Sequence, residues 1–270
     1  MRSLLIVLCC CVCFSSCEDV IDVDLNTAAP RLVIDATMEL NSDGTTSTRV
    51  KLTRSTGFYV EEPVIVTDAE VVIIDELGTR FPIPHNANGI YTSDNSFLSD
   101  RNDTSQFSLE ITDNSFVYTA TESLEQTVPI TQVSQESIDG FGDDIFQIEA
   151  FFSDPQGLGN FYLFEYNDDE NAQIDIGNDE FIDGNEAKTI FFLEDLEAGE
   201  MAQLRIVGID EACFSFYETL LQQTDGAGGP FSTQPATVRG NIINSTNPDR
   251  FPFGYFRVSE VFEVEYTIQE

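Results

Sequence analysis

Apolar and polar residues follow a strand-like pattern along most of the chain beyond Pro30. Arg31–Met38 and Ala69–Asp75 are rich in β-branched residues, and Thr48–Thr53 and Ile145–Phe152 alternate apolar with polar side chains. Both features are typical of strands with one face on a core. They predict strands at 31–38, 48–53, 69–75, 80–84, 90–92, 107–112, 116–121, 145–152, 161–166, 188–193, 202–208, 255–258 and 261–268. We expect the last two to form a terminal hairpin or strand pair.

Turn-forming residues separate these segments. Asn41-Ser-Asp-Gly44, Asp113-Asn114 and Asp154-Pro-Gln-Gly157 contain residues that fix or tolerate turn conformations. Short strands with turns at this spacing are typical of β-sandwiches. We therefore predict an all-β fold of two β-sandwich domains, immunoglobulin-like or fibronectin-like, at residues 30–126 and 127–270.

A helix is predicted in the second domain at residues 210–223. Phe214, Tyr217, Leu220 and Leu221 recur at helical spacing, and Asp210 is a suitable N-cap. Cys213 falls at the start of this helix, where we expect it to be a buried, small apolar residue.

The first residues have the order of a secretory signal. Arg2 precedes the apolar run Leu4–Phe14, which is too short to span a membrane. The small residues Ser15 and Ser16 stand directly before Cys17, as a bacterial lipoprotein processing site requires. We predict a signal peptide at 1–16, lipidation of Cys17 and a tether at 17–29, and the alternative is an ordinary cleaved signal with a chance cysteine.

Cysteine usage and charge restrict the chemistry further. Of six cysteines, four lie in the leader and Cys17 would carry lipid, so Cys213 has no partner for a disulfide or a cysteine-based zinc site. The 48 acidic residues outnumber 12 basic ones, and the net charge of −36 repels nucleic acid and anionic head groups. We expect no nucleic-acid partner and interpret the charge first as a source of solubility.

The acidic run 167–186 is the candidate metal site. Carboxylate oxygens are the ligands that Ca²⁺ prefers, and the residues predicted to bind it are Asp175, Asp179, Asp183 and Glu186. The run lacks the spacing of an EF-hand loop. The alternative is a solvated acidic loop between strands, with no cofactor.

Catalytic patterns are weak. His85 is the sole histidine, no Gly-x-Ser-x-Gly motif occurs, and the glycine-rich segment 225–230 lacks the Lys-Ser/Thr of a phosphate-binding loop. Pairs of carboxylates are unavoidable among so many acids and indicate nothing by themselves. We therefore expect a protein that is not an enzyme.

Several segments in order along the chain carry a family resemblance. They are Cys17–Ile21, Pro30–Ile34, Ser153–Pro155, Asn160–Tyr162, Asp179–Gly184, Pro235–Ile242, Asn247-Pro248 and Phe253–Ser259. Together they resemble the Bacteroidetes lipoprotein family DUF4249, a domain of unknown function. Glu18 and Asp19, after the cysteine, also resemble a signal for export to the cell surface.

The resemblance implies an outer-membrane lipoprotein, commonly encoded beside a TonB-dependent receptor, and it supplies no catalytic residues. We expect a lipid-anchored accessory protein, facing the cell surface rather than the periplasm, that assists such a receptor in ligand capture or uptake. The ligand is unknown. The alternatives are a structural or adhesive surface lipoprotein and a calcium-stabilised hydrolase.

Overall fold

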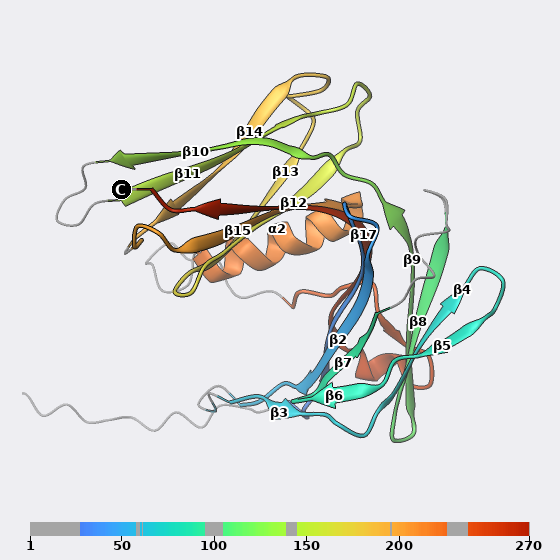
Figure 1. Ribbon diagram of the computed structural model, residues 1–270. Coiled ribbons are helices and arrows are strands. Elements are labelled where there is room, and N and C mark those ends of the chain that lie inside the picture. Colours follow the sequence, from blue (N-terminus) through green and yellow to red (C-terminus); the bar gives the residue numbers. More distant parts are fainter. Residues whose placement is uncertain are drawn as a thin grey trace, which may run out of the picture.

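β-Strands make up most of the structure, a computed structural model that describes residues 28–57, 60, 62–94, 105–138, 145–194, 196–225 and 237–269. The strands form two β-sandwiches, and helix α2 lies in the angle between them (Figure 1). The predicted leader, Cys17 and most of the tether lie outside the described residues. No helix among the described residues is both long and apolar enough to cross a membrane.

The first sandwich encloses one of two large cores. Its first sheet contains β1 (Leu32–Asn41), β2 (Thr46–Arg54), β3 (Val64–Ile65), β6 (His85–Ala87) and β7 (Ile90–Ser93). Its second sheet contains β4 (Glu70–Asp75), β5 (Arg80–Pro82), β8 (Gln106–Asp113), β9 (Phe116–Glu125) and β16 (Ile243–Asn244). Alternation decides which face of β1 is buried, because Ile34 and Met38 are fully buried while Asp35 is exposed.

The second sandwich is built in the same way. One sheet contains β10 (Ile130–Ile138), β11 (Ile145–Ser153) and β14 (Glu186–Leu193). The facing sheet contains β12 (Phe161–Asn167), β13 (Ala172–Asn178), β15 (Met201–Ile209) and the second part of β17 (Phe253–Thr267). Aromatic rings fill the space between the sheets, as Phe152, Tyr162 and Phe164 show with centroids 5.2–6.0 Å apart.

Strand β17 belongs to both sandwiches. It runs parallel to β1 from Phe253 to Val261, and antiparallel to β15 from Val261 to Thr267. The expected terminal hairpin is therefore wrong, because residues 253–267 form one continuous strand. A division of the chain at residue 126 also leaves out part of the first sandwich, whose first sheet takes its final strand from the C-terminal end.

Helix α2 (Glu211–Asp225) and the all-β architecture confirm two predictions. The Asp210 side chain accepts a hydrogen bond from the Cys213 amide at 2.8 Å, as an N-cap does. Cys213 is buried, as expected, and packs with Phe214 and Tyr217 against the outer face of β12, β15 and β17. The helix therefore covers the sheet face that looks away from the second core.

Candidate functional site: the cleft between the sandwiches

A polar cleft of about 770 Å³ lies in the angle between the two sandwiches. Outer faces of β1 and β2 form one wall, and outer faces of β12 and β13 form the other. Tyr217 of α2 also lines it. The lining is rich in charge and hydrogen-bonding groups, such as Asp35, Arg49, Asn167 and Gln173.

Strand register places the first part of a charged network at this cleft. Glu165 on β12 pairs with Arg205 on β15, and Arg205 pairs with Glu263 on β17. The Arg205 guanidinium donates to Glu165 and, at 2.5 Å, to Glu39 of β1, and its Nε lies 3.6 Å from a Glu263 oxygen. One arginine of the second sandwich thus holds a carboxylate of the first.

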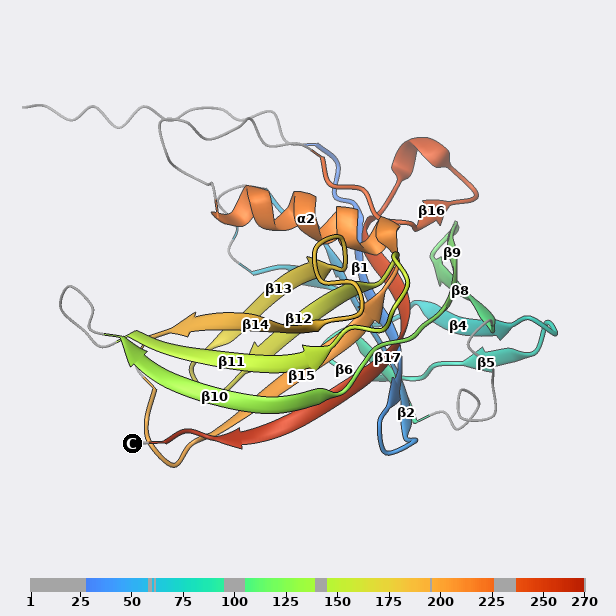
Figure 2. The same cartoon turned by 90° about the horizontal axis from the view of Figure 1, so that it is seen from above.

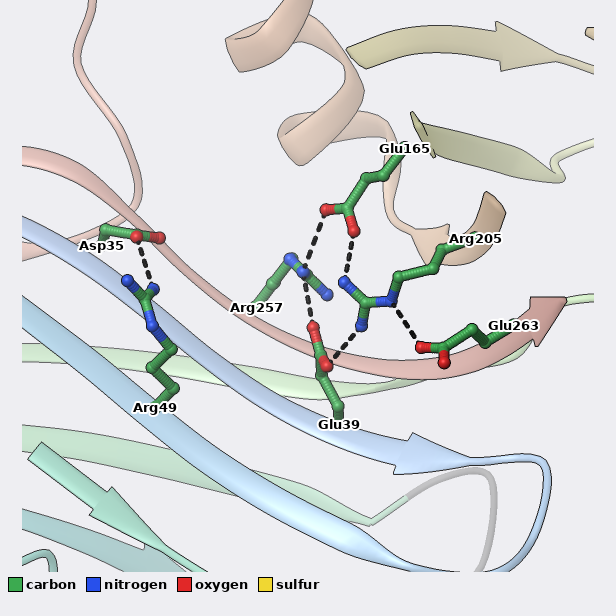
Figure 3. A network of polar contacts seen from close by, with 7 residues as sticks. All are labelled: Asp35, Glu39, Arg49, Glu165, Arg205, Arg257 and Glu263. Carbon is green, nitrogen blue, oxygen red and sulfur yellow. Dashed lines mark hydrogen bonds and ion pairs between the residues drawn. The ribbon is translucent and has the colours of Figure 1, made fainter. Parts of the chain in front are cut away.

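Arg257 completes the network (Figure 3). Its Nη2 donates to Glu39 at 2.7 Å and lies 3.6 Å from Glu165. The two guanidinium groups therefore share the same two carboxylates, and only 8% of the Arg257 side chain is exposed. Buried ions need such pairing, since each loses several kcal/mol of hydration. The network fixes how β1, β12, β15 and β17 lie at the junction of the sandwiches.

The pKa shifts agree with this pairing. Burial by itself would raise the pKa of Glu39, but the guanidinium groups of Arg257 and Arg205 outweigh burial and hold that pKa below its usual value. Burial would lower the pKa of Arg257, and the Glu39 and Glu165 carboxylates raise it instead. Glu39 and Arg257 therefore both stay charged at neutral pH.

Sequence reasoning missed this network. Its contacts join residues 166 and 218 positions apart, and acids are too numerous for any spacing to stand out. The available signal is the scarcity of basic residues. Arg205 and Arg257 stand inside predicted strands of a chain with only 12 Lys and Arg, so each of them needs a partner.

The predicted calcium ligands have other partners in the structure. Asp179 is buried and accepts hydrogen bonds from the amides of Gly159 and Asn160 at 2.7 and 2.9 Å. Asp183 accepts one from the Gly157 amide at 2.6 Å. These two carboxylates therefore join the turn after β11 to the turn before β14.

Asp175 and Glu186 lie elsewhere in the acidic run. Both are exposed, and Asp175 stands on β13, a strand within the run that we expected to be a loop. In the part of the chain that the structure describes, no group of three or more Asp, Glu, His or Cys residues is arranged to hold a metal. The calcium site stays a prediction, which chelation can test.

His85 lies on the exposed strand β6, with its ring against the edge of Tyr91 at a centroid distance of 5.0 Å. The glycine-rich segment after Asp225 and the lipidation candidate Cys17 fall outside the described residues. Among the described residues, the cleft is therefore the candidate site that we consider further.

Fold and site define a class: a two-sandwich β-protein whose modules share a strand and enclose a polar, ion-paired cleft. A sequence model of DUF4249, a domain of unknown function, matches residues 18–265. The chain belongs to this family, as its segments predict, and the family description assigns it no enzymatic activity. A search of curated proteins found no match.

Several solved structures are similar to parts of the chain. A cytokine receptor complex is 10% identical, with 67% of this chain and 85% of that one covered and a TM-score of 0.25. The FN1–FN3 domains of chicken CNTN1 are 12% identical, with 68% and 63% covered and a TM-score of 0.24. A two-domain fibronectin type-III segment of chicken tenascin is 13% identical, with 67% and 91% covered and a TM-score of 0.19.

Proposed function

We propose that this protein is a non-enzymatic lipoprotein, anchored through Cys17 to the outer membrane, that holds a ligand for a TonB-dependent receptor. One observation carries the proposal: the cleft lies further along β1 than the point where the tether joins the body. The tether joins before Leu32, whereas Asp35, Thr37 and Glu39 line the cleft. At about 3.3 Å per residue, the cleft extends from roughly 13 Å (Asp35) to roughly 26 Å (Glu39) along the strand from Arg31.

This geometry suits capture of a ligand beside a membrane. An anchor at one end of the first sandwich leaves the second sandwich and the cleft extended away from the lipid. The shared strand β17 and the Arg205–Arg257 network hold the two walls of the cleft in one arrangement. A preformed site loses little conformational entropy on binding, and anchoring raises the local concentration of the site beside a receptor.

The cleft chemistry favours a polar ligand that forms many hydrogen bonds. Thr37, Ser47 and Tyr217 offer hydroxyl groups, and Asn167 and Gln173 offer amides. Carboxylates line the cleft beside the arginines, so a strongly anionic ligand such as nucleic acid meets repulsion there. Peptides and oligosaccharides fit this chemistry.

Affinity purification from native membranes tests the proposal. The wild-type protein should retain acyl chains on Cys17 and recover a TonB-dependent receptor, whereas a Cys17→Ala variant, which lacks the anchor, should recover much less. Recovery of matrix or neighbouring-cell components in place of a receptor would support the adhesive alternative. Hydrolytic activity that disappears with EDTA would support the hydrolase alternative.

Binding at the cleft has its own test. Gln173→Ala and Tyr217→Phe each remove hydrogen-bonding capacity from the lining and leave every residue of the buried ion network in place. Both should weaken binding of a peptide or glycan that the wild type selects from a library. Thr131→Ala, an exposed change on the distant strand β10, serves as control.

A further inference from the structure

The described arginines fall into two groups. Arg49, Arg54, Arg80, Arg205 and Arg257 each form an ion pair with a carboxylate. In the described part of the chain, no such pair joins Arg31, Arg239 or Arg250 to an acid. In a chain of net charge −36, the positions of these three arginines therefore call for a reason other than an ion pair with a described carboxylate.

The three unpaired arginines gather around aromatic rings. Arg31 and Arg239 both lie over the Phe251 ring, 3.8 and 3.7 Å from its centre. Arg250 lies over Phe116 at 4.7 Å. We call these residues, Arg31, Arg239, Arg250, Phe116 and Phe251, the basic end patch. Arg31 and Arg250 also border a hollow of about 360 Å³ together with Phe116.

Strand directions place this patch at one end of the first sandwich. β1 begins beside it, since Leu32 pairs with Arg54 at the end of β2, and the turn from β8 to β9 precedes Phe116. The 3₁₀ helix η1 (Pro248–Arg250) comes just before the start of β17. Figure 2 shows the start of β1 and the loop with β16 and η1 on the same side of the molecule. This is the end at which the tether joins the body.

Guanidinium and aromatic groups in this combination fit a phosphate-bearing lipid surface. Two N–H groups of one guanidinium can donate to two oxygens of one phosphate. Aromatic rings stacked beneath the guanidinium groups hold the arginine side chains in place. Arg31 donates to the backbone carbonyls of Asp249 and Phe251, which are neutral acceptors. Membrane phosphates attract such residues only within about 8 Å at physiological salt, so the contact must be direct.

The tether keeps this end close to the membrane. From Cys17 to Arg31 the chain can span at most roughly 50 Å. The patch then stays within that reach of the membrane phosphates, and binding becomes an intramolecular event.

We propose that the basic end patch rests on the phosphate layer of the membrane that carries the anchor, and thereby orients the cleft away from the lipid. This proposal rests on the proposed lipid anchor. It assigns a role to arginines that contribute neither to the core nor to the cleft.

Because the chain contains no tryptophan, a single one can report on contact with lipid. Phe116→Trp keeps an aromatic ring beneath Arg250. Phe181→Trp, at a residue 89% exposed between β13 and β14, is the matched control in the second sandwich.

Each mature protein is attached to phosphatidylglycerol-containing vesicles with brominated acyl chains, either by its own lipid or by coupling the Cys17 thiol to a maleimide lipid. Burial raises the pKa of the Cys213 thiol, which keeps it unreactive.

We expect strong quenching of tryptophan fluorescence in the Phe116→Trp variant and little quenching in the Phe181→Trp variant.

Charge removal gives a second test. The double substitution Arg239→Gln with Arg250→Gln should weaken the surface contact roughly 30-fold, at about fivefold per arginine. Lys51→Gln with Arg80→Gln removes the same charge elsewhere and should leave the quenching unchanged. Equal quenching at the two positions, or equal effects of the two double variants, would overturn the proposal. The mass of the cellular protein at Cys17 is a separate readout, so failure of the anchor and failure of the patch are distinguishable.

Discussion

Arginine has opposite surroundings at the two ends of β1. At the cleft, Arg205 and Arg257 are mostly buried and share the carboxylates of Glu39 and Glu165. At the basic end patch, Arg239 and Arg250 are exposed and lie over aromatic rings. The difference teaches that one residue type serves two purposes in an acidic protein. Arginines with internal partners stabilise the fold, while those without a carboxylate remain available to an external phosphate.

The largest effect should come from removing the shared carboxylate. Glu39→Ala leaves the guanidinium groups of Arg205 and Arg257 short of a partner inside the junction, which should cost about 3–5 kcal/mol in the free energy of unfolding. Urea denaturation measures this. The control is Asp35→Ala, whose ion pair with Arg49 is largely exposed and should contribute less than about 1 kcal/mol. Similar losses for both variants would contradict a structural role for the network.

A buried acid outside the network should show an intermediate effect. Asp179→Ala removes the acceptor for the Gly159 and Asn160 amides and should cost about 1–3 kcal/mol, with or without EDTA. Asp175→Ala, at an exposed position on β13, should change stability little. The calcium prediction would be supported by a different result: EDTA lowers the melting temperature of the wild type but does not lower that of Asp175→Ala or Glu186→Ala.

The pH dependence separates charge from packing at the junction. Because the pKa of Glu39 is lower in the folded protein than its ordinary value of 4.5, its charge stabilises the fold above that value. This contribution is lost as the pH falls through the folded pKa. Stability measured from pH 6 to pH 3 should therefore fall more steeply for the wild type than for Glu39→Gln. Parallel curves would show that Glu39 does not act through its charge.

The smallest effect on stability should come from the basic end patch. Arg239→Gln with Arg250→Gln removes exposed side chains whose ring contacts contribute about 0.5–1 kcal/mol each at such sites. The unfolding midpoint should therefore shift only slightly, while contact with vesicles is lost. A large loss of stability would assign these arginines to the fold and would remove the contrast with the cleft.

Local periodicity predicts the strands of the sandwiches and the capped helix α2, because an element with one buried face has a local signature. It misses β10 and β13, two largely polar strands in which no residue is fully buried. The polar pair Ser259-Glu260 also predicts two strands where the structure has the single strand β17. Yet Phe256, Val258, Phe262 and Tyr266 occupy even positions that face the two cores in turn, so the period of two continues through the whole strand.

The cleft could not be predicted in the same way. Glu39 meets Arg257 only because β1 and β17 lie side by side in parallel, a pairing that no local pattern encodes. The four acids proposed for calcium formed a pattern in sequence, but Asp175 stands on β13, whereas Asp179 and Asp183 accept hydrogen bonds from the turn after β11. Local periodicity thus identifies elements, whereas sites depend on how those elements pair.

The proposed function and the orientation of the cleft both depend on an acylated Cys17. Mass spectrometry of the mature protein, purified from the membranes of its own cell, tests this most directly. We predict an N-terminal peptide that begins at Cys17 and carries the mass of two or three acyl chains. A free thiol at Cys17, or a mature protein that begins at another residue, would contradict the account.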